Sequence, residues 1–204
     1  MPTCVAAAGL LVVLARRDGC SWTALGLDPG SLGSGLRWAG ALVAAVLLGY
    51  LVAVALPPTR QAFADTRATS LSGAALLWHL LVRVPLGTAL LEELAFRGVM
   101  YAMVERRHGV RAAVAGTSLL FGLWHVLPSL GLRRANAVAA GVLGAGTTGA
   151  VVAVVAATAG TALAGAVFCE LRRRSGGLLA PFALHWALNA LGLLVAWLAF
   201  ADAG

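Results

Sequence analysis

Long apolar stretches alternate with short, arginine-containing connections along this chain of 204 residues. A helix needs roughly 20 residues to cross a bilayer, and several stretches approach or exceed that length. They are Ala39–Leu56, Leu76–Val104, Ala112–Leu127, Gly176–Phe200 and the shorter, marginal Met1–Ala15. The uncharged stretches 41–55 and 137–167 lack the alternation of polar and apolar residues that transmembrane β-strands show. The pattern predicts an all-α fold: a polytopic transmembrane helical bundle forming one domain over residues 1–204. We expect about six crossings, and roughly five to eight helices if breaks are counted.

The segment Ala135–Leu171 is the hardest to interpret, because one helix of that length would run roughly 55 Å, nearly twice the bilayer core. It is either one crossing with a break near Gly144–Gly149 or Gly160, or two crossings. If the N-terminus lies outside, one net crossing places nine loop arginines on the cytoplasmic side and four outside, whereas two crossings give six and seven. Cytoplasmic loops are enriched in positive charge, so a single net crossing with the N-terminus outside is favoured.

The composition excludes a soluble globular protein. Hydrophobic residues make up 60% of the chain, charged residues 11%, and the mean hydropathy is +0.89. The isoelectric point of 11.0 comes from arginines in short loops, which orient a membrane protein; we therefore expect membrane lipid, and no nucleic acid, as a partner. Arginine without lysine, together with abundant Ala, Gly and Val, is typical of a GC-rich genome and indicates a bacterial cytoplasmic membrane.

Cys4, Cys20 and Cys169 are too far apart to indicate a disulfide framework or a thiolate zinc site.

Two adjacent carboxylates lie inside one of the apolar stretches. The chain has only 8 acidic residues, and Glu92 and Glu93 are two of them. Ionisable side chains at membrane depth are costly and mark a functional site with a nearby partner. Glu93 and Arg97 are four residues apart with the acid first, which is the favourable order for a helical ion pair. Arg97 is therefore predicted to be structural support, and Glu92, rotated away by about 100°, is left without that partner.

Three further polar residues lie at the same depth as the glutamates. Counted from Arg106, Arg111 and Arg174 at about 1.5 Å per residue, Glu92 and Glu93 lie roughly 20 Å from the cytoplasmic edge. On the same scale His125 lies about 21 Å, His185 about 17 Å and Asn189 about 22 Å from that edge. Taken alone, each residue has a simpler interpretation: the histidines could be hydrogen-bonded packing residues, and the glutamate could belong to a buried ion pair that fixes helix register. Their common depth on three helices favours a functional site.

Such a site has several chemical uses. A carboxylate with histidines can activate water, either directly as a general base or through a bound metal. Asn and His can donate hydrogen bonds to a developing oxyanion. The same groups could instead relay protons or bind a cation in a transporter, although no inverted repeat is evident. The HExxH and Gly-x-Ser-x-Gly motifs are absent, so neither a soluble zinc protease nor a serine hydrolase is supported.

The three motifs together resemble the CPBP family of CAAX proteases and bacteriocin-processing enzymes, formerly grouped with abortive-infection proteins. They are EExxxR (Glu92, Glu93, Arg97), FxxxH (Phe121, His125) and HxxxN (His185, Asn189), in this order over residues 85–194. The resemblance implies an intramembrane endopeptidase in which Glu92, with help from His125, activates the attacking water. His185 and Asn189 would stabilise the oxyanion, Glu93 completes the catalytic motif, and Arg97 and Phe121 support it.

The resemblance also implies a peptide or protein substrate, whose identity the motifs do not specify. The family is described as metalloproteases too, so zinc at Glu92, His125 and His185 is a second expectation, while a buried glutamate base needs no metal. The alternative function is a non-proteolytic membrane protein, either an immunity or scaffold protein or a cation- or proton-binding one, that uses the same polar residues.

Overall fold

The computed structural model describes residues 1–131, 135, 136, 141 and 146–200, and their fold is helical. Within these residues there is no strand beyond an isolated bridge between Asp65 and Asn136. The first part of the chain forms α1 (Pro2–Arg17), η1 (Pro29–Ser31), α2 (Leu32–Ala55), α3 (Pro57–Arg60), η2 (Gln61–Phe63) and α4 (Thr66–Thr69). The middle forms α5 (Gly73–Trp78), η3 (His79–Arg83), η4 (Pro85–Ala89), α6 (Leu90–Glu92), η5 (Glu93–Met100), α7 (Tyr101–Trp124) and α8 (Val126–Ser129). The last part forms α11 (Gly146–Ser175) and α12 (Leu179–Phe200).

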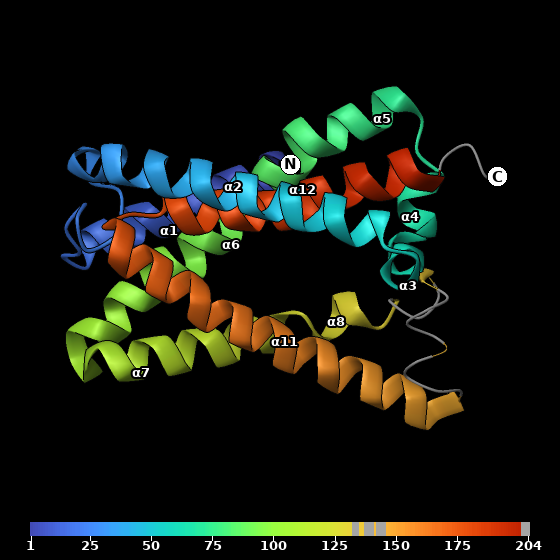
Figure 1. Cartoon of the computed structure of the whole chain (residues 1–204). Helices are drawn as coiled ribbons and strands as arrows, with labels where there is room; N and C mark the ends of the chain where they lie inside the picture. Colours follow the sequence, from blue (N-terminus) through green and yellow to red (C-terminus); the bar gives the residue numbers. More distant parts are fainter. Residues whose placement is uncertain (132–134, 137–140, 142–145, 201–204) are drawn as a thin grey trace.

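Four helical stretches in the described residues are long and apolar enough to cross a membrane: Pro29–Ala55, Gly73–Trp124, Gly146–Ser175 and Leu179–Phe200. The 52 residues of Gly73–Trp124 would extend about 78 Å as one rod, far beyond a bilayer core. Gly109 divides this stretch, because its φ of 79° and ψ of 173° are not helical, and the chain reverses there (Figure 1). Beyond the four candidate spans, the arm that follows the bend, from Val110 to Trp124, and α1, with 16 residues, are both marginal in length for a further crossing. The predicted all-α membrane fold is confirmed.

The ambiguous segment Ala135–Leu171 contains one long helix in its described part. α11 runs for 30 residues and continues through Gly160 without interruption, so the break considered there is wrong. Most of the other candidate break, Gly144–Gly149, belongs to this helix from Gly146 onward, and residues 144 and 145 lie outside the described residues. The described part therefore supplies the single crossing that the arginine distribution favoured.

Close packing between α7 and α11 depends on glycine. These two helices pack along each other, as do α2 and α12, and in Figure 1 the two pairs lie on opposite sides of α6. A Cβ atom at Gly122 would lie only 2.6 Å from the carbonyl oxygen of Thr158 on α11. A Cβ atom at Gly165 would lie 3.0 Å from Cα of Ser118 and 3.2 Å from Nη2 of Arg97. Small residues at these two positions allow the helix backbones to approach each other.

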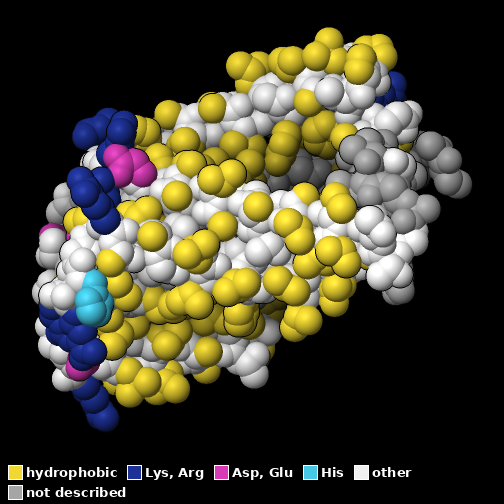
Figure 2. Space-filling model, turned by 90° about the horizontal axis from the view of Figure 1, so that it is seen from below, with side chains coloured by type: hydrophobic (Ala, Val, Ile, Leu, Met, Phe, Trp, Pro, Cys, Tyr) yellow, Lys and Arg dark blue, Asp and Glu magenta, His cyan; other side chains and the backbone are white. Residues whose placement is uncertain are grey.

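Arginines gather at one end of the molecule (Figure 2). The connection after α1, the bend at Gly109 and the C-terminal end of α11 meet there. Arg106 donates to the carboxylate of Asp18, and Arg172 donates to the carbonyl oxygen of Ala24. We call this the arginine-rich end; it carries the arginines at positions 16, 17, 37, 106, 107, 111 and 172–174. Among described residues the opposite end has Arg60 and Arg67, so the distribution is strongly asymmetric.

Candidate active site

Glu92 lies at the centre of a group of polar side chains contributed by three helical segments. Its carboxylate is buried, with 7% of the residue exposed. Oε1 accepts a hydrogen bond from Nε1 of Trp124 at 3.1 Å. Oε2 is buried without a hydrogen-bond partner, and it lies 4.0 Å from Nε2 of His125 and 3.8 Å from Nε2 of His185. These separations exceed a direct hydrogen bond but can be bridged by one water molecule.

The tautomers of both histidines follow from their other contacts. Nδ1 of His125 lies 2.8 Å from the carbonyl oxygen of Phe121, which can only accept, so Nδ1 carries a proton. Nδ1 of His185 lies 2.8 Å from Oε1 of Glu93 and donates to that carboxylate. In neutral rings both Nε2 atoms then present lone pairs toward Oε2 of Glu92. The three acceptor atoms lie near one another, an arrangement that suits a shared proton or a polarised water molecule.

The local backbone explains how these side chains reach each other. His125 follows the last residue of α7 with φ −87° and ψ 0°, between helical geometry and extended geometry, and α8 begins at Val126. Many active-site residues occupy this sparsely populated region. Glu93–Met100 is π-helical, as are His79–Arg83 and Pro85–Ala89, and wide turns of this kind are frequent at functional sites.

Glu93 and Arg97 form the predicted ion pair. Nη1 of Arg97 lies 3.3 Å from Oε1 of Glu93, the same oxygen that accepts from His185. Both side chains are almost entirely buried. The guanidinium of Arg97 also lies over the rings of Phe121 at 3.9 Å and Phe168 at 4.8 Å. Aromatic faces attract a cation, so this enclosure stabilises a charge that has few hydrogen-bond acceptors.

Phe121 contacts the site in two ways, and its supporting role stays a prediction. Its ring lies under Arg97 and contacts the ring of His125 edge-on at 4.5 Å, while its carbonyl oxygen fixes the orientation of that histidine. Two neighbours were not predicted from the sequence. Trp124 donates to Glu92, and Phe168 stacks on His185 at 5.5 Å. The position of Trp124 next to His125 was an available signal; Phe168 lies in an Ala- and Gly-rich helix and had none.

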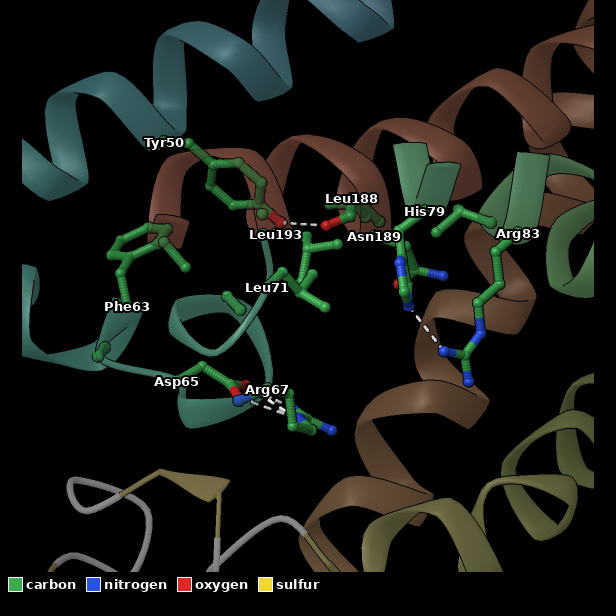
Figure 3. A pocket seen from close by; sticks show the side chains of 15 residues that line it. Tyr50, Phe63, Asp65, Arg67, Leu71, His79, Arg83, Leu188, Asn189 and Leu193 are labelled. Atoms are coloured by element: carbon green, nitrogen blue, oxygen red, sulfur yellow. Dashed lines mark hydrogen bonds and ion pairs between the residues drawn. The ribbon is translucent and has the colours of Figure 1, made fainter. Parts of the chain in front are cut away.

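Asn189 lies apart from this group. It is exposed on α12, one turn beyond His185, and no hydrogen bond in the described residues joins it to Glu92, His125 or His185. It lines a cavity of about 680 Å³ that we call the Arg83 cavity (Figure 3). The polar residues of its lining are Tyr50, Asp65, Arg67, His79, Arg83 and Asn189, and Leu71, Val84 and Leu193 are among the apolar ones. The other members of the predicted catalytic set do not line it.

The zinc expectation is not supported by the arrangement of ligands. Within the described residues, no group of three or more His, Cys, Asp or Glu side chains is placed to hold a metal ion. Glu92, His125 and His185 are near neighbours but do not form such a set as they stand. Zinc binding at these residues stays a prediction.

The fold and the site define a class: a polytopic helical membrane protein with a buried carboxylate facing two histidines. Residues 74–191, more than half of the chain, match the family model described as Type II CAAX prenyl endopeptidase Rce1-like, and the chain belongs to this family. No curated protein and no solved structure matches the chain. The match contains all three motifs and confirms the resemblance to CAAX proteases. It supports a protease function at the level of the family.

Proposed function

We propose that this protein is an intramembrane endopeptidase that hydrolyses a peptide bond of a membrane-associated substrate with water activated by Glu92 and His125. The observation that carries the proposal is the buried, unpartnered Oε2 of Glu92, with Nε2 of His125 and of His185 both within 4.0 Å. A water molecule bound among these atoms would be polarised by a general base in a setting of low dielectric. That is the requirement for general-base hydrolysis.

The proposed chemistry uses the residues as follows. Glu92 takes a proton from water as the water oxygen attacks the scissile carbonyl carbon, and His125 orients the water through Nε2. The carbonyl oxygen becomes an oxyanion, which accepts a hydrogen bond from His185 when the Nε2 of that residue is protonated. The Glu93 carboxylate stabilises positive charge on the His185 ring through the contact at Nδ1. Glu92 then returns its proton to the leaving amine as the carbon–nitrogen bond breaks.

The protein is an integral membrane protein, and we propose that it spans a bacterial cytoplasmic membrane with its arginine-rich end inside. Nine arginines at that end against two at the opposite end, in the described residues, support this orientation. α1 runs toward the arginine-rich end and finishes at Arg16 and Arg17, so the N-terminus would lie outside. The orientation can be tested in a variant without the native cysteines. A single cysteine is introduced at position 2 or at position 107, and its labelling by a membrane-impermeant reagent is measured.

The central experiment compares wild type with Glu92→Gln in detergent on a peptide library. Glutamine preserves the shape of the side chain and can accept from Trp124, but it cannot take the proton of water. We expect turnover to collapse while a bound peptide is retained and the thermal midpoint of unfolding stays close to wild type. Glu170→Gln, at an exposed position on α11, is the matched control and should cleave normally. Cleavage by Glu92→Gln at the wild-type rate would end the proposal.

Metal dependence requires a separate experiment. Purified protein is analysed for bound zinc and assayed after chelation and after zinc is added back. Full loss of activity that zinc restores would show that Glu92, His125 and His185 rearrange to hold a metal. Unchanged activity in metal-free protein would support glutamate acting alone as the base.

A further inference from the structure

The Arg83 cavity contains a cation that no carboxylate of the described residues neutralises. Nη1 of Arg83 lies 2.7 Å from Nε2 of His79, and Nδ1 of His79 lies 2.7 Å from the carbonyl oxygen of Ala75. A guanidinium only donates and a carbonyl only accepts, so His79 accepts at Nε2 and donates at Nδ1. His79 is therefore neutral in this arrangement. Arg83 keeps Nε and Nη2 as donors without an acceptor among the described residues (Figure 3).

The other charged residues of the lining neutralise each other. Nε and Nη2 of Arg67 both donate to the carboxylate of Asp65, at distances from 2.5 to 3.1 Å. Burial raises the pKa of Asp65, but the hydrogen bonds and the charge of Arg67 outweigh burial, and the pKa lies below its usual value. Asp65 is thus ionised at neutral pH and compensates Arg67. Within the part of the chain that the structure describes, the lining carries one uncompensated positive charge, on Arg83.

The surroundings of Arg83 belong to the bilayer. On the scale that places Glu92 roughly 20 Å from the arginine-rich edge, Arg83 is nine residues further from that edge, at roughly 34 Å, close to the opposite boundary of a bilayer core of about 30 Å. The helical stretch around Arg83 exposes Leu77, Leu81 and Leu86, which face lipid in a membrane-spanning helix. The cavity also includes Asp65 and Arg67, from the connection at the end opposite the arginine-rich end. A long arginine side chain at such a position extends toward the lipid head groups.

We propose that the Arg83 cavity binds an anionic phospholipid, with its phosphate on Arg83 and its glycerol and upper acyl carbons against Leu71, Val84 and Leu193. The free Nε and Nη2 of Arg83 form the fork that matches two phosphate oxygens. The amide of Asn189, exposed on the same lining, is a further donor. The lining is both polar and apolar, as a lipid head group joined to its chains requires.

A phospholipid fits this cavity better than the carboxylate of a peptide. Glu92, His125 and His185 do not line the cavity, whereas lipid-facing leucines flank the helix that carries Arg83. The proposal does not depend on peptidase activity. It does place a lipid against α12 one turn beyond His185, so the lipid would brace the helix that carries part of the candidate active site.

The test measures binding of phosphatidylglycerol to purified protein in phosphatidylcholine nanodiscs, by lipid titration and native mass spectrometry. Arg83→Gln keeps much of the side-chain length and removes the charge, and it should weaken phosphatidylglycerol binding about 10–100-fold, the scale of hydrogen bonds to a charged group. Arg60→Gln is the matched control. Arg60 is exposed at the same end and lies over the ring of Phe200, away from the cavity lining. This control should bind within about twofold of wild type.

Several outcomes would overturn the lipid assignment. They are equal weakening in both variants, no preference for phosphatidylglycerol over phosphatidylcholine, displacement by millimolar inorganic phosphate, or displacement by peptides with a free but not an amidated C-terminus. If Arg83→Gln does not fold, wild-type protein is crosslinked to phosphatidylglycerol carrying a photoreactive group near its head group. Adducts within residues 62–84 or 188–196 support the proposal, and adducts confined to other segments refute it.

Discussion

His185 and Glu93 are joined by a hydrogen bond of 2.8 Å between residues 92 positions apart in the sequence. The oxygen that accepts it is also the one that pairs with Arg97. Glu93 therefore links the first and third motifs and fixes the ring of His185, so that Nε2 of that ring faces Glu92. The two adjacent glutamates thus differ in surroundings, since Oε1 of Glu93 is held by His185 and Arg97, whereas Oε2 of Glu92 lies within 4.0 Å of Nε2 of both histidines.

Glu93→Gln should destabilise the protein. The substitution leaves the fully buried Arg97 without a counter-ion, and removing one partner of a buried ion pair typically costs about 3–5 kcal/mol. We expect a lower folded yield and a lower thermal midpoint, measured by size-exclusion chromatography and thermal unfolding in detergent. Glu170→Gln removes an exposed carboxylate that pairs with Arg173 and Arg174, and should leave the midpoint in place. Equal midpoints for the two variants would show that the buried pair does not stabilise the fold.

Arg97→Lys should also lower the folded yield. Lysine keeps the charge, but an ammonium group lacks the planar face that lies 3.9 Å from the centre of the Phe121 ring. The peptide bonds cleaved by any remaining active protein should be unchanged, because Arg97 is fully buried behind Glu93 and Phe121. Arg106→Lys, at an exposed ion pair with Asp18, is the control with normal yield expected. Normal yield of Arg97→Lys together with an altered cleavage pattern would contradict the supporting role.

Gly122→Ala should weaken the packing of α7 on α11. The new Cβ would lie 2.6 Å from the Thr158 carbonyl oxygen and 2.9 Å from Cβ of Ala162, so one helix must move. Overpacking of this kind usually costs about 1–3 kcal/mol. Gly160→Ala is the matched control, because nothing lies within 4 Å of its added Cβ, and alanine is the better helix former. A reduced thermal midpoint for Gly122→Ala alone confirms the contact; a midpoint at or above that of Gly160→Ala argues against it.

Much of the fold and the core of the site were predictable from the sequence, for identifiable reasons. The length of the apolar stretches predicted the membrane-spanning helices. The four-residue spacing of Glu93 and Arg97 predicted their ion pair. The common depth of Glu92, His125 and His185 agrees with their observed proximity, because helices in a bilayer run nearly parallel and equal depth brings side chains together.

The remaining features depend on helix rotation, which depth does not determine. Asn189 has the depth of the glutamates, yet it faces the Arg83 cavity, because it is rotated on α12 relative to His185. Phe168 lies on α11 and His185 on α12, so their stacking depends on how these two helices are rotated against each other. Arg83 and His79 are four residues apart on one helical stretch, and this spacing allows their contact. Their shared cavity depends on how α2, η3 and α12 meet.

Trp124→Phe should lower turnover without unfolding the protein. Phenylalanine keeps an aromatic ring beside Phe96 but removes the hydrogen bond that Nε1 donates to Oε1 of Glu92. Without that donor the carboxylate can rotate away from the attacking water, and we expect kcat to fall about tenfold or more, in line with one hydrogen bond to a charged group. Trp186→Phe removes a similar hydrogen bond, to the carbonyl oxygen of Leu80 outside the site, and should retain wild-type kcat. Identical kcat values for both variants would mean that Trp124 does not position Glu92.

Asn189→Ala separates an oxyanion donor from a lipid ligand. We predict that phosphatidylglycerol binding weakens as it does in Arg83→Gln, whereas kcat and KM stay near wild type, because Asn189 faces the Arg83 cavity and no hydrogen bond within the described residues joins it to the candidate active site. The pH of maximal activity should stay in place because Asn does not titrate. The thermal midpoint should also hold, since Asn189 is exposed and makes no hydrogen bond within the described residues. Arg83→Gln provides the comparison, since it alters the same cavity without touching the proposed reaction and should leave kcat near wild type. A kcat lowered about 10²–10³-fold in Asn189→Ala, the usual scale for losing one oxyanion donor, would instead identify Asn189 as a second oxyanion donor beside His185 and contradict its role as a lipid ligand.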